Sequence, residues 1–313
     1  MQQQVVPQEM ITRGEASGAT VTVHAPAKLN LSLAVLDRRA DGYHDIESLM
    51  VPVTLHDTLH VTPTTAPGIR LRVRQGGRLA GLGPGFSGDV PTDSTNLVVR
   101  AAEALAREVG IDSGLEIDLL KQIPSGAGLG GGSSDAAAAM QAAADAWHIG
   151  WSSERLAALG ATIGSDVPWF FTGGPAVVTG RGERVEPVEG IPSLPVVIVK
   201  PSVGLSTAAV YRGCQPDITR RGEAMRLAIA IRGGLHAAIP FMHNALEAPA
   251  RALCPEVERL LGDLHRAGAV HPMLTGSGSA CFAISRTISE ARHIAARMES
   301  MGWQAVFAVR LCA

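Results

Sequence analysis

The residues with the clearest chemical potential form a glycine-rich stretch, IPSGAGLGGGSSDAA, over 123–137. Five of these fifteen residues are glycines, and a run of alanines follows them. Glycines let the main chain approach an anion without a Cβ in the way, and the free amide groups at a helix start attract negative charge. The stretch therefore predicts a phosphate-binding loop that leads into a helix.

Several kinds of loop could explain these glycines. A Walker A loop is excluded because no Lys-Ser or Lys-Thr pair follows them. Gly126, Gly128 and Gly131 spell the GxGxxG of a dinucleotide-binding turn. However, Pro124 and Ser125 interrupt the join to the preceding strand, and no strand ending in an acidic residue follows about 20 residues later. A plain flexible connector is disfavoured because a capped helix is attached, which leaves a different phosphate loop of the PxGxGLGSS type.

Two further positions carry groups that phosphoryl transfer needs. Asp166 lies in the turn GSDVPWFF (164–171), and Lys28 lies in APAKLNLSL (25–33). A carboxylate can accept a hydroxyl proton, and an ammonium group can neutralise phosphate charge. Taken alone, however, Asp166 fits a turn beside Pro168, and Lys28 fits a solvated charge on a strand edge. The residues themselves leave both roles open.

The elements that must position these groups follow from periodicity in the first half of the chain. Alternation in VTVHAPAKLNLSLAVL predicts a strand bent at Pro26, with one buried apolar face and Lys28 on the other, polar face. The pair Asp41-Gly42 predicts a hairpin turn. Further strands are expected at 46–54, 57–62, 69–74, 114–123 and 175–179.

Helix caps are expected from short polar residues and glycines. A helix over 95–110 is predicted to begin at Ser94 or Thr95 and to end at Gly110. The helix after the glycine loop is predicted to be capped by Ser133 or Ser134, with Asp135 favoured by the positive helix start. A third helix, over 152–164, is predicted to begin at Ser152 or Ser153.

The second half of the chain has a different pattern. Strands at 194–201, on both sides of a second glycine loop within 271–286, and at 303–311 combine with a helix over 289–302. Extra helices are expected at 206–213, 222–232, 241–253 and 255–268. Without some of these extra helices the order is β-α-β-β-α-β, which is ferredoxin-like. The predicted organisation is a flexible tail (1–20), a first domain (21–189) and a second domain (190–313), with the boundary near 186–192.

Composition narrows the class of protein. The chain has 313 residues, 46% of them hydrophobic and 18% charged, and a net charge of −2. These values predict a large core and give no general attraction to nucleic acid or anionic membranes. Four scattered cysteines without a CxxC pair indicate reduced thiols. No segment has the pattern of a membrane span or a signal peptide, so a cytoplasmic protein is expected.

Three motifs together resemble those of one enzyme family. PSGAGLGGGSSDAA resembles the second motif of the GHMP kinases, the family of galactose, homoserine, mevalonate and phosphomevalonate kinases. APAKLNLSL resembles the first motif, and LTGSGSACF (274–282) resembles the third. The resemblance implies an α+β fold whose N-terminal half is like ribosomal protein S5 domain 2 and whose C-terminal half is ferredoxin-like. It also implies ATP and Mg²⁺ as cofactors.

The same resemblance implies roles for individual residues. Asp166 and Lys28 become the catalytic pair, and Asn96 falls at a position near the adenine. The residues implied to hold the ATP phosphates are Pro124, Ser125, Gly126, Ala127, Gly128, Leu129, Gly130, Gly131, Gly132, Ser133 and Ser134. The side chains that contact the metal are left open, with Ser134 ahead of Asp135.

The run RRADGYHDIES (38–48) resembles one branch of the family, whose members act on a cytidine-diphospho sugar alcohol in the non-mevalonate route to isoprenoid precursors. For this branch Tyr43 and Tyr211 are implied to pack on the two faces of the cytosine, and His44 to bond its polar edge. Other residues implied to lie at the substrate are Asn30, Thr207, Gly276, Ser277 and Gly278, the last three also bracing the phosphate loop.

The leading hypothesis is an ATP-dependent kinase that phosphorylates the 2-hydroxyl of this cytidine-diphospho substrate. A mevalonate- or homoserine-type kinase of the same family is the first alternative. A non-catalytic nucleotide- or RNA-binding protein on the same fold is the second, and the near-neutral charge without a basic stripe counts against it. No nucleic-acid or membrane partner is expected, and the chain is predicted to be a monomer or a homodimer.

Overall fold

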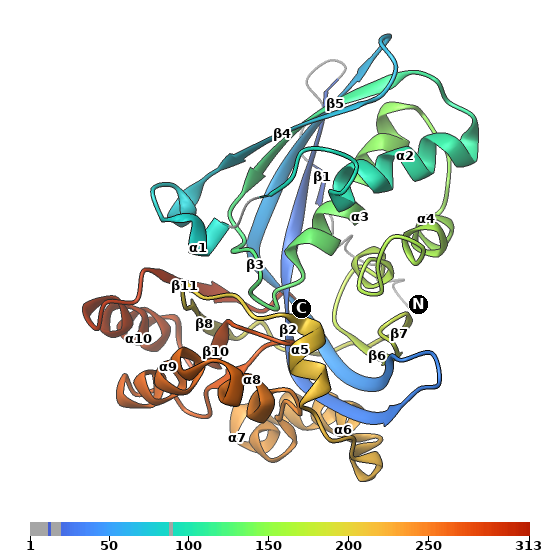
Figure 1. The fold of residues 1–313 in the computed structure, drawn as a ribbon. Helices are drawn as coiled ribbons and strands as arrows, with labels where there is room; N and C mark the ends of the chain where they lie inside the picture. Colours follow the sequence, from blue (N-terminus) through green and yellow to red (C-terminus); the bar gives the residue numbers. More distant parts are fainter. Residues whose placement is uncertain (1–11, 14–19, 88–89) are drawn as a thin grey trace, which may run out of the picture.

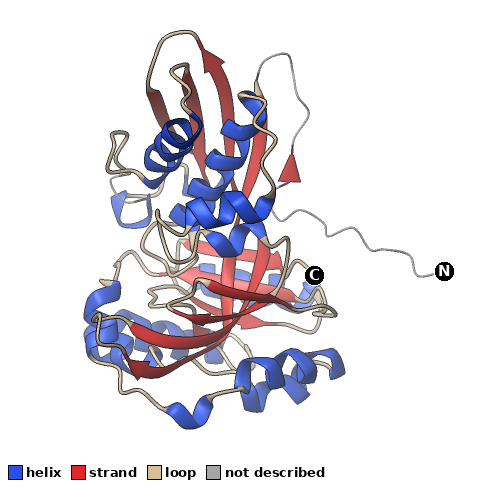
Figure 2. Cartoon of the chain, turned by 90° about the vertical axis from the view of Figure 1, so that its right-hand side faces the viewer, coloured by secondary structure: helices blue, strands red, loops and turns tan. Residues whose placement is uncertain are grey.

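Two β-sheets, one above the other, organise the chain (Figures 1 and 2). The computed structural model describes residues 12–13, 20–87 and 90–313. The first sheet has the order β1-β2-β3-β5-β4, with β6 paired to β3 and β7 to β6. Its strands are β1 (Thr12–Arg13), β2 (Val21–Arg38), β3 (His44–Thr64), β4 (Ile69–Gln75), β5 (Gly114–Lys121), β6 (Ala176–Gly180) and β7 (Arg184–Pro187).

Strands β2 and β3 form a long hairpin that reaches from the upper part of the molecule into the lower part (Figure 1). The register of the pair shifts between Pro26 and Lys28, where the sequence predicts a bend, and again farther along. The prediction that only one face of β2 is buried is wrong. Lys28, Asn30 and Ser32 are only 4%, 2% and 1% exposed, because loops of the second half cover this side.

Helices α2 (Leu97–Val109), α3 (Gly131–Ala146) and α4 (Ser153–Gly160) lie together against the first sheet (Figure 1). The alanine-rich α3 contacts β2, β3 and α2, and its alanines 136–139 and 142–144 are buried. Small side chains allow this helix to approach the sheet closely, which packs the core at high density. The helix start is thereby brought next to β2.

The caps differ partly from the prediction. Helix α2 begins at Asn96, whose Oδ1 accepts a hydrogen bond from the amide of Val98, so the caps expected at Ser94 or Thr95 are wrong. Gly110 ends this helix with φ 70°, as predicted. Helix α3 begins at Gly130 with φ 71° and has no side-chain cap, so the seryl caps expected there are wrong too. Ser152 caps α4 as predicted.

The second sheet has the order β11-β8-β10-β9, with its first strand between its fourth and third. This is the ferredoxin-like order that the sequence predicts. Its strands are β8 (Pro195–Lys200), β9 (Met273–Leu274), β10 (Cys281–Ile284) and β11 (Ala305–Arg310). The remaining helices are α1 (Pro84–Ser87), α5 (Thr207–Arg212), α6 (Glu223–Ala230), α7 (Leu235–Ala238), α8 (Glu247–Leu253), α9 (Pro255–Arg266) and α10 (Ile288–Ser300). Short 3₁₀ turns occur at η1 (Gly77–Leu79), η2 (Pro168–Phe171), η3 (Ile218–Arg220), η4 (Ile231–Gly233) and η5 (Ile239–Phe241).

Some expectations concern the edges of these units. Most of the predicted tail, residues 1–11 and 14–19, lies outside the described residues, but Thr12–Arg13 form a strand paired with β2. Strand β7 has no counterpart in the prediction. The domain boundary near 186–192 stays a prediction, and it covers the end of β7 and part of the loop before β8.

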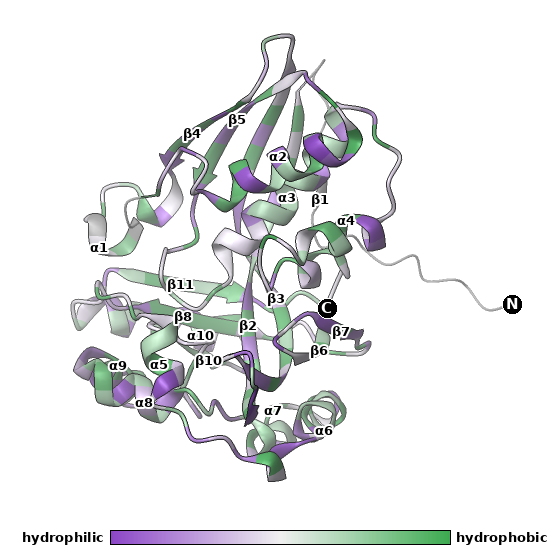
Figure 3. Ribbon diagram, turned by 45° about the vertical axis from the view of Figure 1, so that its right-hand side comes forward, coloured by the Kyte–Doolittle hydropathy of each residue, from purple (hydrophilic) through white to green (hydrophobic). Residues whose placement is uncertain are grey.

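The two halves share one hydrophobic core at their junction. Leu29 and Leu31 of β2 lie in the same buried cluster as Ile198 of β8 and Phe282 of β10. Figure 3 shows hydrophobic residues along β8 and β11, where this cluster lies. Burial of apolar surface is the dominant favourable term in folding, so this cluster joins the halves into one body.

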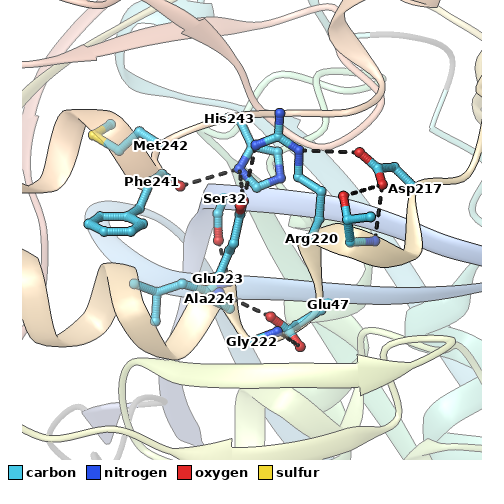
Figure 4. Close-up of polar contacts among 12 residues, drawn as sticks. Ser32, Glu47, Asp217, Arg220, Gly222, Glu223, Ala224, Phe241, Met242 and His243 are labelled. Carbon is cyan, nitrogen blue, oxygen red and sulfur yellow. Dashed lines mark hydrogen bonds and ion pairs between the residues drawn. The ribbon is translucent and has the colours of Figure 1, made fainter.

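A polar contact reinforces the junction. The buried carboxylate of Glu47 in β3 accepts hydrogen bonds from the amides of Gly222 and Ala224, at 2.9 and 3.0 Å, at the start of α6 (Figure 4). A carboxylate at a helix start satisfies free amides and complements the helix dipole. Beside it, the imidazole of His243 lies 3.4 Å from a carboxylate oxygen of Glu223. Strand β3 is therefore anchored in the second half by charge as well as by packing.

Candidate active site

A cavity of about 1070 Å³ lies where the two halves meet. Its lining comes from the β2–β3 hairpin, the glycine loop, the turn at 165–166, the turn after β6, helix α5 with its flanks and the second glycine loop. Thirteen predicted site residues line it: Lys28, Asn30, Tyr43, His44, Gly126, Gly128, Gly130, Asp166, Thr207, Tyr211, Gly276, Ser277 and Gly278. The chain thus brings together residues that are up to 250 positions apart, from Lys28 to Gly278.

Lys28 is held in place by a chain of buried hydrogen bonds. Its Nζ donates to Oδ1 of Asn30 at 2.6 Å, and Nδ2 of Asn30 donates to Oγ of Ser48 at 2.8 Å. Ser48 in turn donates to the carbonyl of Ser32 at 2.5 Å. Because each link is buried and bonded, the ammonium group is fixed in position rather than free to follow solvent.

Lys28 and Asp166 are electrostatic partners. Burial lowers the pKa of Lys28, while the negative charge of Asp166 acts in the opposite direction and raises it. A cation and a carboxylate that face one cavity in this way can support proton transfer and charge neutralisation on a bound phosphate. Both residues line the same cavity, as a catalytic pair requires, and their catalytic role stays a prediction.

The glycine loop passes very close to its neighbours. Gly126, Gly128 and Gly130 have φ values of 59°, 75° and 71°, which L side chains rarely adopt. A Cβ at Gly128 would lie 2.1 Å from the carbonyl oxygen of Thr275, and one at Gly130 would lie 2.9 Å from Cγ of Lys28. Glycine is therefore required at both positions for the loop to fit between β2 and the second glycine loop.

Replacing Gly128 by alanine should weaken both the fold and nucleotide binding. The positive φ alone costs about 1–3 kcal/mol, and the contact with Thr275 adds to it. We expect a lower melting temperature and a rise of the KM for ATP of roughly tenfold or more. Gly150→Ala is the matched control, because no atom lies within 4 Å of a Cβ there. An unchanged KM for ATP would show that Gly128 does not contribute to nucleotide binding.

The second glycine loop packs directly on the first. The amides of Ser279 and Ala280 donate to the carbonyls of Gly126 and Ala127 at 3.3 and 3.2 Å. Asn244 donates its Nδ2 to the carbonyl of Gly276 at 2.9 Å and so holds the second loop from behind. The predicted bracing of one loop by the other is confirmed by these bonds.

Other predicted loop residues face away from the cavity. Ala127 and Leu129 are buried in the core at the junction, and Ser134 is completely buried inside α3. In helix α3 the first intrahelical bond runs from the amide of Ser134 to the carbonyl of Gly130, at 2.9 Å. The amides of 131–133 precede it and remain available to an anion. A binding role for Pro124, Ser125 and Gly131–Ser133 stays a prediction.

Asn96 does not line the cavity. Its Oδ1 accepts from the amide of Val98, and its Nδ2 donates to the carbonyl of Pro91 at 2.6 Å. The side chain therefore uses its amide group to begin α2 and to hold the preceding turn. Contact with an adenine stays a prediction.

Aromatic side chains also line the cavity: Tyr43, His44 and Tyr211. The rings of His44 and Tyr211 lie 5.2 Å apart at an angle of 31°. Tyr43, which is 53% exposed, presents its ring to the guanidinium of Arg181. Burial, with a smaller contribution from Asp166, raises the pKa of Tyr211, so this phenol stays neutral. The hydroxyls of Thr207 and Ser277, which also line the cavity, form a hydrogen bond of 2.8 Å.

One buried network beneath the glycine loop is absent from the sequence-based prediction. Nζ of Lys121 contacts carboxylate oxygens of both Asp57 and Asp135, the latter at 2.6 Å. Asp57 also accepts from the amides of Gln122 and Ile123, which lead into the loop. The carboxylate of Asp135 is therefore paired with Lys121, and the first turn of α3, where the sequence predicts Asp135 to be favoured, contains no acidic residue. The signal was available, because Lys121 follows the apolar parity of β5 and is buried with it.

The donor groups of the cavity fit a metal ion that arrives with the nucleotide. Mg²⁺ usually binds through one or two carboxylates together with substrate phosphates. Asp166 supplies a carboxylate here, and Ser165 and Ser277 supply hydroxyls. Neither Ser134 nor Asp135, the two predicted candidates, lines the cavity. Within residues 12–13, 20–87 and 90–313, no group of three His, Cys, Asp or Glu side chains could hold a metal ion.

None of the helices among the described residues has the length and apolar character needed to cross a membrane.

Comparison with known proteins tests the resemblance. The family model for the GHMP kinases N terminal domain matches residues 96–174, and that for the GHMP kinases C terminal matches residues 215–302. A 4-diphosphocytidyl-2-C-methyl-D-erythritol kinase of Pelotomaculum thermopropionicum is 42% identical over 279 residues, covering 88% of this chain and 93% of the relative. The enzyme of the same name from Rhodopirellula baltica is 39% identical over 88% of this chain and 90% of its own length.

Solved structures agree with this result. A crystal structure of 4-(cytidine 5'-diphospho)-2C-methyl-D-erythritol kinase superimposes with a TM-score of 0.76 at 34% identity, covering 93% of this chain and 99% of that one. A homoserine kinase from Cytophaga hutchinsonii, at 19% identity and a TM-score of 0.69, covers 96% of each chain and shares the fold. The chain therefore belongs to the GHMP kinase family and, within it, to the 4-diphosphocytidyl-2-C-methyl-D-erythritol kinases.

Proposed function

We propose that the protein transfers, in this cavity, the γ-phosphoryl group of ATP to the 2-hydroxyl of 4-diphosphocytidyl-2-C-methyl-D-erythritol. This reaction belongs to the methylerythritol phosphate route to isoprenoid precursors. One observation carries the proposal: a single cavity is lined both by Lys28, Asp166 and the glycine loop and by the Tyr43, His44 and Tyr211 rings. The names of relatives that are 37–42% identical support the same reaction.

Asp166 and Lys28 have different roles in the reaction. Asp166 accepts the proton of the substrate hydroxyl, and Lys28 neutralises charge on the hydroxyl and the transferred group. Because the transition state of phosphoryl transfer is loose, exact placement of these groups contributes more than base strength. The hydrogen bond from Lys28 to Asn30 supplies that placement. Mg²⁺, bound with ATP, supplies further neutralisation of phosphate charge.

The glycine loop holds the triphosphate through main-chain groups. The amides at the start of α3 point toward an anion, and glycines at 126, 128 and 130 leave room for it. This arrangement replaces the lysine of a Walker A loop by backbone donors. The aromatic rings then select the cytidine, since base–aromatic stacking contributes about 1–3 kcal/mol per base.

Tyr43→Ala should therefore raise the KM for the cytidyl substrate roughly 5- to 100-fold and leave the KM for ATP unchanged. The ring is exposed and makes little contribution to the core, so the variant should fold normally. Steady-state kinetics with each substrate varied in turn measure both values. Equal rises in the two KM values would refute a role for Tyr43 at the cytosine.

The test of the proposed function is a parallel kinase assay. The purified protein is supplied with ATP and Mg²⁺ and with the cytidyl substrate, mevalonate or homoserine, and phosphorus NMR identifies the new phosphomonoester. We expect turnover with the cytidyl substrate alone. Turnover with mevalonate or homoserine instead would overturn the assignment in favour of another kinase of the family. A cytoplasmic location and a monomeric or homodimeric state stay predictions.

A further inference from the structure

Arg181 lies in the tight turn between β6 and β7, at the rim of the cavity. Its flanking residues Gly180 and Gly182 both have positive φ, 71° and 113°. The amide of Arg181 donates to a carboxylate oxygen of Glu183 at 2.6 Å, which closes the turn. The backbone of Arg181 is thus fixed, and its side chain projects from a rigid base.

The turn lies close to both Tyr43 and Asp166. The guanidinium carbon of Arg181 lies 4.9 Å from the centroid of the Tyr43 ring. At the next residue, a Cβ at Gly182 would lie 3.4 Å from Oδ1 of Asp166 and 3.8 Å from the carbonyl oxygen of Ser165. The turn therefore links the Tyr43 ring with the neighbourhood of the aspartate.

Within the part of the chain that the structure describes, the guanidinium of Arg181 forms no ion pair. No carboxylate there lies within 4.0 Å of its guanidinium, although its field lowers the pKa of Asp41 together with the stronger effect of Arg39. Arg39 itself is paired with Asp41 and Asp45 at 3.0 Å. Arg181 thus differs from its neighbour in having a cationic group that is free to bind an anion.

We propose that Arg181 binds the diphosphate of the substrate and at the same time holds Tyr43 in place for the cytosine. This inference rests on the proposed function, which puts the base at Tyr43 and the reacting hydroxyl at Asp166. The diphosphate joins these two parts of the substrate and must pass between them. The guanidinium of Arg181 lies over the Tyr43 ring, and the next residue, Gly182, lies beside Asp166, so Arg181 is placed along that path.

The guanidinium group can perform both tasks at once. Its flat face stacks on an aromatic ring, while its N–H groups point outward in the plane and match two phosphate oxygens. Charge-assisted bonds of this kind are about twice as strong as neutral ones. A lysine would supply the charge but neither the stack nor the paired donors.

Two other arginines, Arg38 and Arg212, line the cavity. Arg38 lowers the pKa of His44, after the larger effect of burial. Arg212 lies in the last turn of α5. Among these three arginines, Arg181 is the one that lies over the Tyr43 ring and is followed by a residue beside Asp166.

The experiment measures the binding of cytidine, CMP and CDP to the wild-type protein and to Arg181→Met by calorimetry, without turnover. In the wild type we expect affinity to rise with each phosphate. In Arg181→Met we expect CDP to lose roughly 10- to 100-fold, with a much smaller loss for cytidine. Arg181→Lys should recover part of the CDP affinity, because it retains the charge. Arg72→Met, on exposed β4, is the matched control and should change none of these values.

Kinetics supply the second readout. Arg181→Met should raise the KM for the cytidyl substrate by a similar factor and leave the KM for ATP and most of kcat unchanged, because Arg181 does not touch the reacting atoms. Equal losses for cytidine and CDP would overturn the proposal and leave Arg181 only the support of Tyr43. Absence of any turnover by the wild type would contradict the proposed function instead, while the calorimetric comparison would still decide whether Arg181 binds the diphosphate.

Discussion

Asp166→Asn should lower kcat by about 10²–10⁴-fold and leave both substrates bound. The amide has nearly the size of the carboxylate but accepts no proton from the substrate hydroxyl. Because the loss concerns the transition state and not the ground state, both KM values should change by less than about threefold. Steady-state kinetics and calorimetric binding of each substrate measure the two effects separately.

Ser165→Ala is the matched control, since Ser165 also lines the cavity next to Asp166. It should reduce kcat far less. Near-normal turnover of Asp166→Asn would remove this carboxylate from the mechanism.

The same variant has an expected effect on the pH profile. Burial lowers the pKa of Lys28, and the charge of Asp166 partly offsets this lowering. In Asp166→Asn the offset is lost, so the pKa of Lys28 falls further. The remaining activity, which needs the ammonium form, should therefore decline at a lower pH than wild-type activity does. An unshifted alkaline limb would argue against electrostatic coupling of the two residues.

Lys121→Met should lower the free energy of unfolding by about 3–5 kcal/mol. Lys121 is the shared cationic partner of Asp57 and Asp135, and all three side chains are buried. Without it two carboxyl groups remain close together in a medium of low dielectric constant. Urea-induced unfolding, followed by circular dichroism at pH 7, measures the loss.

An exposed ion pair in the same sheet supplies the control. Arg70 of β4 and Glu116 of β5 lie 3.2 Å apart with both side chains about half exposed. Arg70→Met should change stability by no more than about 1 kcal/mol. Neutralising the two acids in Lys121→Met, with Asp57→Asn and Asp135→Asn, should restore part of the stability. A loss in Lys121→Met as small as in Arg70→Met would show that the buried network contributes little.

The sequence predicted the elements that local patterns determine. Alternation identified β2 and β5, the second half gave the ferredoxin-like order, and three motifs identified the family. These features depend on residues close together in the chain. Lys28 and Asp166 were also found, because each lies inside a recognisable motif.

The remaining features depend on contacts between distant segments. Only one face of β2 was expected to be buried, but the second half also covers the polar face through bonds such as that from the amide of Asn30 to Thr275. The caps of α2 and α3 were placed wrongly because Asn96 and Gly130 compete with nearby serines and a threonine. Arg181 carries no local signal, since its place beside Tyr43 depends on how β6 pairs with β3.

The shared core has a consequence for engineering. Leu29 and Leu31 of the first half pack with Ile198 and Phe282 of the second, and the carboxylate of Glu47 binds the amides at the start of α6. A chimera that joins the first half of one relative to the second half of another would bring mismatched surfaces together where the two halves pack. Recombination within the family should therefore exchange the β2–β3 hairpin together with the C-terminal sheet on which it packs. A crossover placed only at the linker between the two halves would not do this.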